Sequence, residues 1–231
     1  MKRSVVAWLV PSALAFTLPL SAAAQRGAQP TARAARFLAL GDSYTIGEQV
    51  DSADRWPVQL VRALRARRLA IADPEIVART GWTTDELAAG IAVAAPLGPY
   101  DLVTLLIGVN NQYRGREAER YREEFKSLLA QAVEFAGGRP ARVVVLSIPD
   151  WGVTLFAAGR DRARIASAID RFNAINREEA LRAGARWVDV TAASREAREG
   201  WVTADGLHPS GRQYARWVEL AIETVVRALG S

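Results

Sequence analysis

The sequence predicts a single doubly wound α/β domain, in which helices cover both faces of a parallel sheet to form an α/β/α sandwich. First, short apolar segments with β-branched residues alternate with longer segments of helical period, which is the pattern of βαβ units. Second, the segments Leu102–Ile107 and Val143–Ile148 are apolar nearly throughout, as strands covered on both faces should be. Third, residues 36–231 contain no internal repeat and no Pro/Gly-rich linker, and about 195 residues fit one domain.

The predicted central sheet has about five strands, each of them a short apolar run before a helical segment. Because a helix follows each strand, neighbouring strands should be parallel and joined by crossover connections. In chain order the predicted strands are Phe37–Leu40, Glu75–Ala78, Leu102–Ile107, Arg142–Ile148 and Arg186–Val190.

The predicted helices are the longer segments in which apolar residues recur every three or four positions. The clearest case is the third helix, where Tyr121, Phe125 and Leu128 begin an apolar face that continues to Phe135. Capping-box spacing marks two helix starts, at Thr83/Glu86 and at Ser210/Gln213. The predicted helices are Pro57–Arg68, Thr84–Val93, Arg116–Ala136, Asp161–Ala183 and Gly211–Leu229.

Residues 1–24 have the pattern of a secretory signal peptide. Lys2 and Arg3 precede an apolar run from Val5 to Leu20, and the small residues Ser21–Ala24 follow it as a signal-peptidase site. A membrane anchor is the alternative, but prolines interrupt the run, which is shorter than the roughly 20 apolar residues of a spanning helix. We therefore expect cleavage near Ala24, no membrane span in the mature protein, and a periplasmic or secreted location.

The composition excludes several kinds of site and partner. The chain has no cysteine, which excludes disulfides, thiolate zinc sites, iron–sulfur clusters and cysteine nucleophiles, and its one histidine excludes a multi-histidine metal site. We expect no metal, no cofactor and a monomer. Loss of residues 1–24 lowers the net charge from +5 to +3, and the arginines are interspersed with acids, so we expect no nucleic-acid partner. Residues 25–35 should form a flexible lead-in to the domain at 36–231.

Polar residues that carry chemistry follow the predicted strands. Ser43 lies just after the first strand, Gly81 after the second, Asn110 after the third, and Asp205 and His208 after the fifth. Ligands of open parallel sheets bind beyond the carboxyl ends of the strands, so these residues should meet at one edge. A binding module without catalysis could use the same edge, but no Gly-x-Gly-x-x-Gly and no Walker loop supports a nucleotide role.

These residue types are the parts of a serine hydrolase. A serine hydroxyl becomes nucleophilic when a base takes its proton, and His208 is the only histidine candidate. Asp205, three residues earlier, can hold the second imidazole nitrogen and stabilise the imidazolium ion. Gly81, Asn110 and the backbone N–H of Ser43 can donate to the oxyanion of an acyl-transfer intermediate.

The order of these segments resembles that of the GDSL, or SGNH, hydrolases. The resembling blocks are Gly41-Asp42-Ser43-Tyr44, Gly81, Gly108-Val109-Asn110-Asn111 and Asp205-Gly206-Leu207-His208. The resemblance implies a flavodoxin-like sheet, Ser43 as nucleophile, an Asp205–His208 pair completing the triad, and an oxyanion hole of Gly81, Asn110 and the Ser43 N–H. The chain departs from the family pattern at Tyr44, where the name-giving Leu usually stands, and at Asn111, where Asp is common.

The expected activity is hydrolysis of carboxylic esters through an acyl-enzyme on Ser43. An acyltransferase that uses the same acyl-enzyme is the alternative. The substrate class stays open between a lysophospholipid, a simple acyl ester, a thioester and an O-acetylated glycan. The candidate substrate contacts are Tyr44, Trp82, Asn111, Trp151 and Trp201, although the indoles could equally be loop anchors. Arg79 and Arg114 are candidate contacts for an anionic head group.

Overall fold

The computed structural model describes residues 1, 4, 33–196 and 198–231. The predicted signal peptide and the lead-in up to residue 32 therefore lie almost entirely outside the described residues. The compact domain begins at Arg33, slightly before the predicted start at residue 36. Arg33 pairs with Asp101 at 2.8 Å, and Ala35 forms a parallel bridge with Ile71. The chain is thus attached to the domain before the first strand begins.

The sheet has five parallel strands in the order β2-β1-β3-β4-β5. This order is the flavodoxin-like one, so the predicted fold class is confirmed. The chain winds outward from β1 to β2 and then crosses to β3 on the other side, which places the topological switch point between β1 and β3. The strands are β1 (Phe37–Gly41), β2 (Glu75–Ala78), β3 (Leu102–Leu106), β4 (Val143–Leu146) and β5 (Arg186–Val188).

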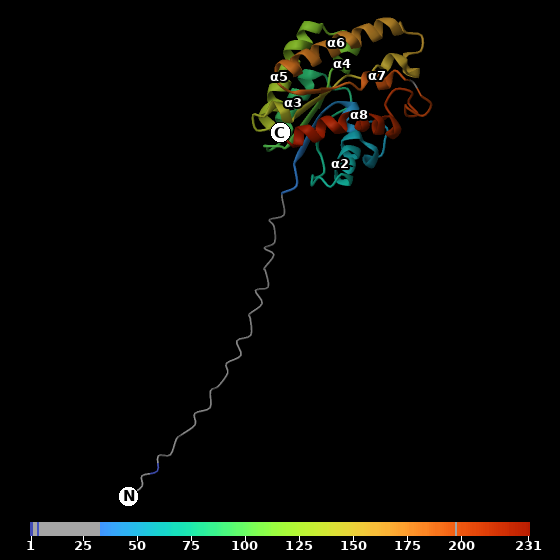
Figure 1. Cartoon of the computed structure of the whole chain (residues 1–231). Helices are drawn as coiled ribbons and strands as arrows, with labels where there is room; N and C mark the ends of the chain where they lie inside the picture. Colours follow the sequence, from blue (N-terminus) through green and yellow to red (C-terminus); the bar gives the residue numbers. More distant parts are fainter. Residues whose placement is uncertain (2–3, 5–32, 197) are drawn as a thin grey trace. The chain divides into compact units, whose positions relative to one another are not determined.

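Helices cover both faces of the sheet (Figure 1). One face carries α2 (Trp56–Ala66) and α8 (Gly211–Leu229), which pack against each other. The opposite face carries α3 (Thr84–Ala94), α5 (Ala118–Phe135) and α6 (Arg162–Arg182). None of the helices in the described ranges is long and apolar enough to cross a membrane.

Short helices lie beyond the carboxyl ends of three strands, and they position the candidate site. The α-helical ones are α1 (Ser43–Ile46), α4 (Val109–Tyr113) and α7 (Thr191–Ser194). Single 3-10 turns span Ser52–Asp54, Pro140–Arg142, Trp151–Val153 and Leu155–Ala157. They escape prediction because elements of three to five residues are too short to display a helical period.

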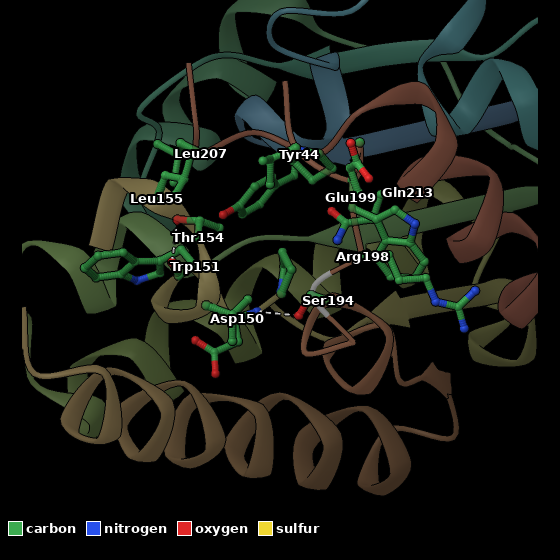
Figure 2. A pocket seen from close by; sticks show the side chains of 16 residues that line it. Tyr44, Asp150, Trp151, Thr154, Leu155, Ser194, Arg198, Glu199, Leu207 and Gln213 are labelled. Atoms are coloured by element: carbon green, nitrogen blue, oxygen red, sulfur yellow. Dashed lines mark hydrogen bonds between the residues drawn. The ribbon is translucent and has the colours of Figure 1, made fainter. Parts of the chain in front are cut away.

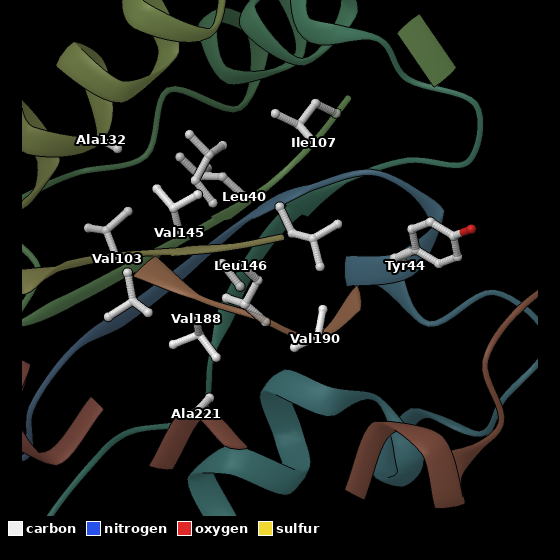
Figure 3. Packing of buried hydrophobic residues seen from close by; sticks show 14 of the residues in the cluster. Leu40, Tyr44, Val103, Ile107, Ala132, Val145, Leu146, Val188, Val190 and Ala221 are labelled. Atoms are coloured by element: carbon white, nitrogen blue, oxygen red, sulfur yellow. The ribbon is translucent and has the colours of Figure 1, made fainter. Parts of the chain in front are cut away.

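The core lies on both faces of the sheet (Figure 3). Strands β1, β3 and β4 are buried along their whole length, as expected for central strands of a doubly wound sheet. Each buried Leu or Val contributes about 1.5–3 kcal/mol relative to an exposed side chain. The core extends to Tyr44, which directly follows the candidate nucleophile in sequence. Close packing of the core therefore fixes the backbone at the site.

Strand β4 ends two residues earlier than predicted because the backbone leaves the sheet at Ile148. The Ile148 N–H donates to Asn173 Oδ1 at 2.7 Å, and the Ile148 carbonyl accepts from Asn173 Nδ2 at 2.9 Å. A side chain of α6 thus replaces the neighbouring strand as hydrogen-bond partner. This exchange turns the chain toward Trp151 and the site.

Candidate active site

Ser43 lies at the sharp turn that joins β1 to α1. The turn requires glycine at position 41, because a Cβ there would lie 2.5 Å from the Leu106 carbonyl oxygen and would overlap the Thr45 hydroxyl. Asp42 caps the helix, since its Oδ1 accepts from the Tyr44 N–H at 3.0 Å. The backbone N–H of Ser43 is therefore at the first turn of α1, where helix N–H groups lack helical partners.

The Asp42 carboxyl group is completely buried beneath the nucleophile. Its second oxygen, Oδ2, has no hydrogen-bond partner among the residues that the structure describes. Burial raises the pKa of Asp42 to about 7, against the lowering effect of the Tyr44 N–H bond. Asp42 is thus a capping residue that retains a proton far more readily than an exposed aspartate does.

Asp205 and His208 form a hydrogen-bonded pair on one loop. Asp205 Oδ2 lies 2.6 Å from His208 Nδ1. The other oxygen, Oδ1, accepts from the Thr203 hydroxyl at 2.7 Å and from the N–H groups of Leu207 and His208 at 2.8 and 3.0 Å. The loop closes on itself through the Thr203 N–H, which donates to the His208 carbonyl at 2.8 Å.

These hydrogen bonds determine the charge of Asp205. Partial burial acts to raise the pKa of Asp205, but the bonds from His208, Leu207 and Thr203 outweigh it and lower the pKa to about 2. The carboxylate is therefore ionised at neutral pH and orients the imidazole so that Nε2 is left for another partner. Ser210 caps α8 directly after this loop, as the sequence predicts.

One cavity of about 140 Å³ brings together Ser43, Asn110 and His208. These residues come from the ends of β1, β3 and β5, as predicted from the positions after the strands. The Ser43 hydroxyl makes no hydrogen bond with any described residue, and His208 Nε2 makes none either. Such contacts often tighten only when a substrate is bound. The remaining lining residues are Tyr44, Val109, Tyr113, Trp151, Phe156 and Leu207.

The candidate oxyanion donors lie on two loops that contact each other. Asn110 Nδ2 donates one hydrogen to the Trp82 carbonyl at 2.9 Å, which leaves its second hydrogen for a ligand. Gly81 has φ +85°, a conformation that favours glycine. Its carbonyl accepts from Arg114 Nη2 at 2.7 Å, while its N–H has no partner in the described part of the chain. Gly81 does not line the cavity itself, but its loop is fixed directly beside Asn110.

The five predicted substrate contacts lie in different places. Tyr44 and Trp151 line the cavity with Ser43, and Trp201 lines a neighbouring one. Trp82 instead packs its indole over Gly90 of α3, where a Cβ would overlap the ring. Asn111 is fully buried, accepts from the Thr84 N–H at 3.1 Å and donates to the Thr84 hydroxyl at 2.6 Å. Trp82 and Asn111 therefore hold α3 and α4 in place and do not face the cavity.

Arg114, a candidate contact for an anionic head group, instead forms hydrogen bonds within the protein. Besides the Gly81 carbonyl, Arg114 binds both carboxylate oxygens of Glu86 at 3.2 Å. These bonds stabilise the loop that contains Gly81, and they occupy the Arg114 guanidinium group with partners in the protein.

An aromatic cluster lies at the cavity, and the sequence indicated only one of its members, Trp151, as a substrate contact. The rings of Tyr113, Trp151 and Phe156 contact one another, and the Arg160 guanidinium lies 5.2–5.3 Å from all three ring centres. The Trp151 indole N–H donates to Gln112 Oε1 at 2.8 Å. Only the abundance of aromatic residues near strand ends could have signalled this cluster, because it is assembled from separate short turns.

Solved structures of similar fold belong to lipolytic proteins and esterases. TesA superposes with a TM-score of 0.64 at 19% identity, covering 82% of this chain and 97% of TesA. A lipase/acylhydrolase from Enterococcus faecalis gives a TM-score of 0.63 at 20% identity, covering 83% of this chain and 95% of the other. Axe2, an acetylxylan esterase from Geobacillus stearothermophilus, gives 0.60 at 17% identity, covering 85% and 94%.

No sequence among the curated proteins matches this chain. The family model of the GDSL-like lipase/acylhydrolases, however, matches residues 39–216, which include every residue of the proposed site. The fold, the family match and the four sequence blocks agree. The chain therefore belongs to the GDSL-like lipase/acylhydrolase family and is a serine hydrolase that acts on ester bonds.

Proposed function

We propose that this hydrolase cleaves short-chain carboxylic esters through a Ser43–His208–Asp205 triad. The observation that carries the proposal is the single cavity in which Ser43, His208 and the Asn110 amide meet, with Asp205 2.6 Å behind the imidazole. The cavity is small, about 140 Å³, and aromatic side chains bound it. A pocket of this size suits an acetyl or other short acyl group better than a lipid chain.

In the proposed reaction Ser43 Oγ attacks the ester carbonyl carbon while His208 Nε2 takes the hydroxyl proton. The negative charge that develops on the carbonyl oxygen is stabilised by the Ser43 N–H, the Gly81 N–H and the free hydrogen of Asn110 Nδ2. His208 then protonates the leaving alcohol oxygen. Water, deprotonated by His208, attacks the acyl-enzyme, and Ser43 recovers its proton as the acid departs.

The test compares the purified protein with Ser43→Ala on p-nitrophenyl esters of increasing acyl length. We expect hydrolysis of the acetate and butyrate esters, a steep decline toward the octanoate, and no activity in the folded variant. A fluorophosphonate should label the native protein and not Ser43→Ala. Turnover that persists in Ser43→Ala, or equal turnover of all acyl lengths, would contradict the proposal.

The aromatic cluster provides a second test of acyl-length selection. Phe156→Ala should enlarge the cavity and raise the octanoate-to-acetate ratio of kcat/KM. The control is Phe135→Ala, which changes a half-buried ring at the far end of α5, packed against Tyr100, and should leave this ratio unchanged. An unchanged ratio in Phe156→Ala would show that the cluster does not limit the acyl group.

We also propose that the protein is exported. The support is the basic start, the apolar run 5–20 and the small residues at 21–24. Cell fractionation followed by N-terminal sequencing would test it, with a mature chain that begins near Gln25 as the expected result. A cytosolic protein that retains Met1 would overturn it.

A further inference from the structure

A second cavity adjoins the proposed active site. It has a volume of about 330 Å³ and lies between the loop after β4, the residues that follow α7, and the start of α8 (Figure 2). Tyr44, Trp151 and Leu207 line both cavities, which therefore adjoin at these three residues. The volume is that of the smaller ligand pockets of proteins.

The walls of this second cavity are largely apolar. Pro149, Val153, Leu155, Trp201, Val202 and Pro209 line it together with the three shared residues. Of the polar groups, the Ser194 hydroxyl already donates to the Thr191 carbonyl and accepts from the Asp150 N–H. The Thr154 hydroxyl donates to the Trp151 carbonyl at 2.7 Å. These two hydroxyls are therefore satisfied within the protein.

Two buried polar side chains in the cavity have no such partner. Tyr44 is 3% exposed and Gln213 is 4% exposed. Neither the Tyr44 hydroxyl nor the Gln213 carboxamide forms a hydrogen bond with a residue in the described ranges. Both side chains line the cavity. In Figure 2 the Tyr44 hydroxyl is directed toward Thr154 and Leu155, and Gln213 lies near Glu199. Neither group is among the fully buried polar atoms without a partner, so both are open to the cavity. A ligand that fills the cavity and displaces solvent would have to supply hydrogen bonds to these groups, whereas an apolar ligand would leave them unsatisfied.

Three charged residues line the cavity, and none of them is both buried and unpaired within the described ranges. The Asp150 carboxylate is held by Arg195 at 2.9 Å and by the Gly152 N–H at 2.8 Å, and it points away from the cavity in Figure 2. Arg198 pairs with Glu196 at 2.6 Å and is exposed, as is Glu199. Burial raises the pKa of Tyr44 well above its ordinary range, so its hydroxyl stays neutral. The chemistry therefore suits a neutral ligand.

The position of the cavity indicates which part of an ester would occupy it. Leu207 and Pro209, which flank His208 in sequence, both line it, and the Tyr44 ring lies 6.0 Å from the imidazole ring. His208 must protonate the leaving oxygen, so the alcohol portion of the substrate has to lie on this side. Of these two cavities, Val109 and Tyr113 line the smaller one and not the second, on the Asn110 side, which is left for the acyl group.

We propose that the second cavity is a subsite for the alcohol portion of the ester, and that it binds a neutral alcohol with an apolar body and a second oxygen function. The second oxygen, a hydroxyl or a carbonyl, bonds to Gln213 and Tyr44 while the apolar body lies between Trp201 and Leu207. This subsite rests on the proposed esterase function. It makes the enzyme selective for the alcohol as well as for the acyl group.

The test uses three acetate esters of nearly equal size that differ at one end of the alcohol. They are the esters of 4-methylbenzyl alcohol, of 4-(hydroxymethyl)benzyl alcohol and of 4-(aminomethyl)benzyl alcohol. The native enzyme should show about tenfold higher kcat/KM for the hydroxymethyl ester than for the methyl ester, since one or two buried hydrogen bonds contribute about 1.4 kcal/mol. The cationic aminomethyl ester should be the poorest.

Gln213→Leu should abolish the preference for the hydroxymethyl ester, and Tyr44→Phe should reduce it. Val153→Trp, which fills the cavity, should lower kcat/KM for the benzyl esters more than for ethyl acetate. The control is Gln131→Leu, which removes an amide from α5 and should change neither activity nor preference. Circular dichroism checks that each variant is folded. An unaltered preference in folded Gln213→Leu and Val153→Trp would overturn the proposal.

A binding measurement separates this subsite from the esterase proposal. Calorimetric titration of Ser43→Ala with 1,4-benzenedimethanol needs no turnover and should show binding that Gln213→Leu in the same background weakens. If native enzyme fails to hydrolyse any ester but the diol binds through Gln213, the esterase proposal fails, the assignment to an ester's alcohol fails with it, and only a binding site for a neutral diol stands. If hydrolysis occurs and the diol does not bind, the subsite fails alone.

Discussion

The Asn110 side chain and the Trp82 backbone are joined by a hydrogen bond of 2.9 Å from Nδ2 to the carbonyl oxygen. The bond connects the loop after β3 with the loop after β2, and Gly81 directly precedes Trp82. Two candidate oxyanion donors are thereby held in one arrangement before any substrate arrives. Preorganised donors of this kind cost no reorganisation when charge develops in the transition state.

Asn110→Ala should therefore lower kcat by about 10²- to 10³-fold with a much smaller change in KM. The reason is that the amide donates to charge present only in the transition state. Steady-state kinetics on a short acyl ester measures the effect. A change confined to KM would mean that Asn110 binds the ground state and not the oxyanion.

The neighbouring residue Asn111 serves as a contrasting case. Asn111→Ala should destabilise the fold by about 1–3 kcal/mol, because it leaves the buried Thr84 N–H without its acceptor. Urea denaturation of both variants should show this loss in Asn111→Ala and little loss in Asn110→Ala. Equal stability losses would contradict the separate roles assigned to the two residues.

Asp205→Asn should lower kcat by about 10³- to 10⁴-fold. The native carboxylate accepts from His208 and is ionised at neutral pH because its pKa is lowered to about 2, whereas an amide can present a donor to Nδ1 and favour the wrong tautomer. Kinetics at neutral pH would measure the loss. Retention of more than a tenth of the native rate would exclude Asp205 as the residue that orients His208.

Asp42→Asn should change the dependence of stability on pH. The pKa of Asp42 is about 7 in the folded protein against 3.8 without the fold, so between these values only the folded state holds the proton. The contribution of Asp42 to stability is therefore greatest below the lower value and is lost as the pH rises toward the upper one.

Asparagine keeps the acceptor for the Tyr44 N–H but does not ionise. The stability of Asp42→Asn relative to native protein should thus increase between about pH 4 and about pH 8. Urea midpoints of both proteins at the two pH values provide the measurement. A constant difference between the proteins would show that Asp42 does not carry a raised pKa.

Gly90→Ala should destabilise the protein by about 1–3 kcal/mol through overpacking against the Trp82 indole. Helix propensity alone predicts the opposite sign, because alanine stabilises a helix interior relative to glycine by about 1 kcal/mol. Thermal denaturation distinguishes the two effects. A more stable variant would mean that the indole moves aside at no cost.

The sequence predicted the sheet and the meeting of Ser43, Asn110 and His208, because continuous apolar strands and the residues that follow them obey general rules of parallel sheets. It did not predict where side chains point within a loop. Asn111 follows Asn110 on α4, where one residue corresponds to about a 100° rotation, and it is directed into the protein. Trp82 turns toward α3 because Gly90 leaves space for its ring.

The aromatic cluster and the second cavity could not be read from the sequence for a different reason. Tyr113 and Phe156 lie on separate short turns. Gln213 is a polar residue near the start of α8, so the recurrence of apolar residues along that helix does not mark it as buried. Their proximity depends on how the loops after β3, β4 and β5 pack on one another. The residues that line the substrate cavities can therefore be identified only from the tertiary structure. The reacting residues can be identified from the sequence, because they directly follow the predicted strands.

The loop from Thr203 to His208 makes every contact that aligns the carboxylate with the imidazole. Such a turn is encoded by neighbouring residues, whereas Ser43 arrives from near the other end of the chain. The alignment of acid with base is therefore set by local hydrogen bonds, whereas the approach of Ser43 to His208 is set by the packing of the whole domain. A substitution far from the site that shifts this packing would change the distance between nucleophile and base before it changed the pairing of base and acid.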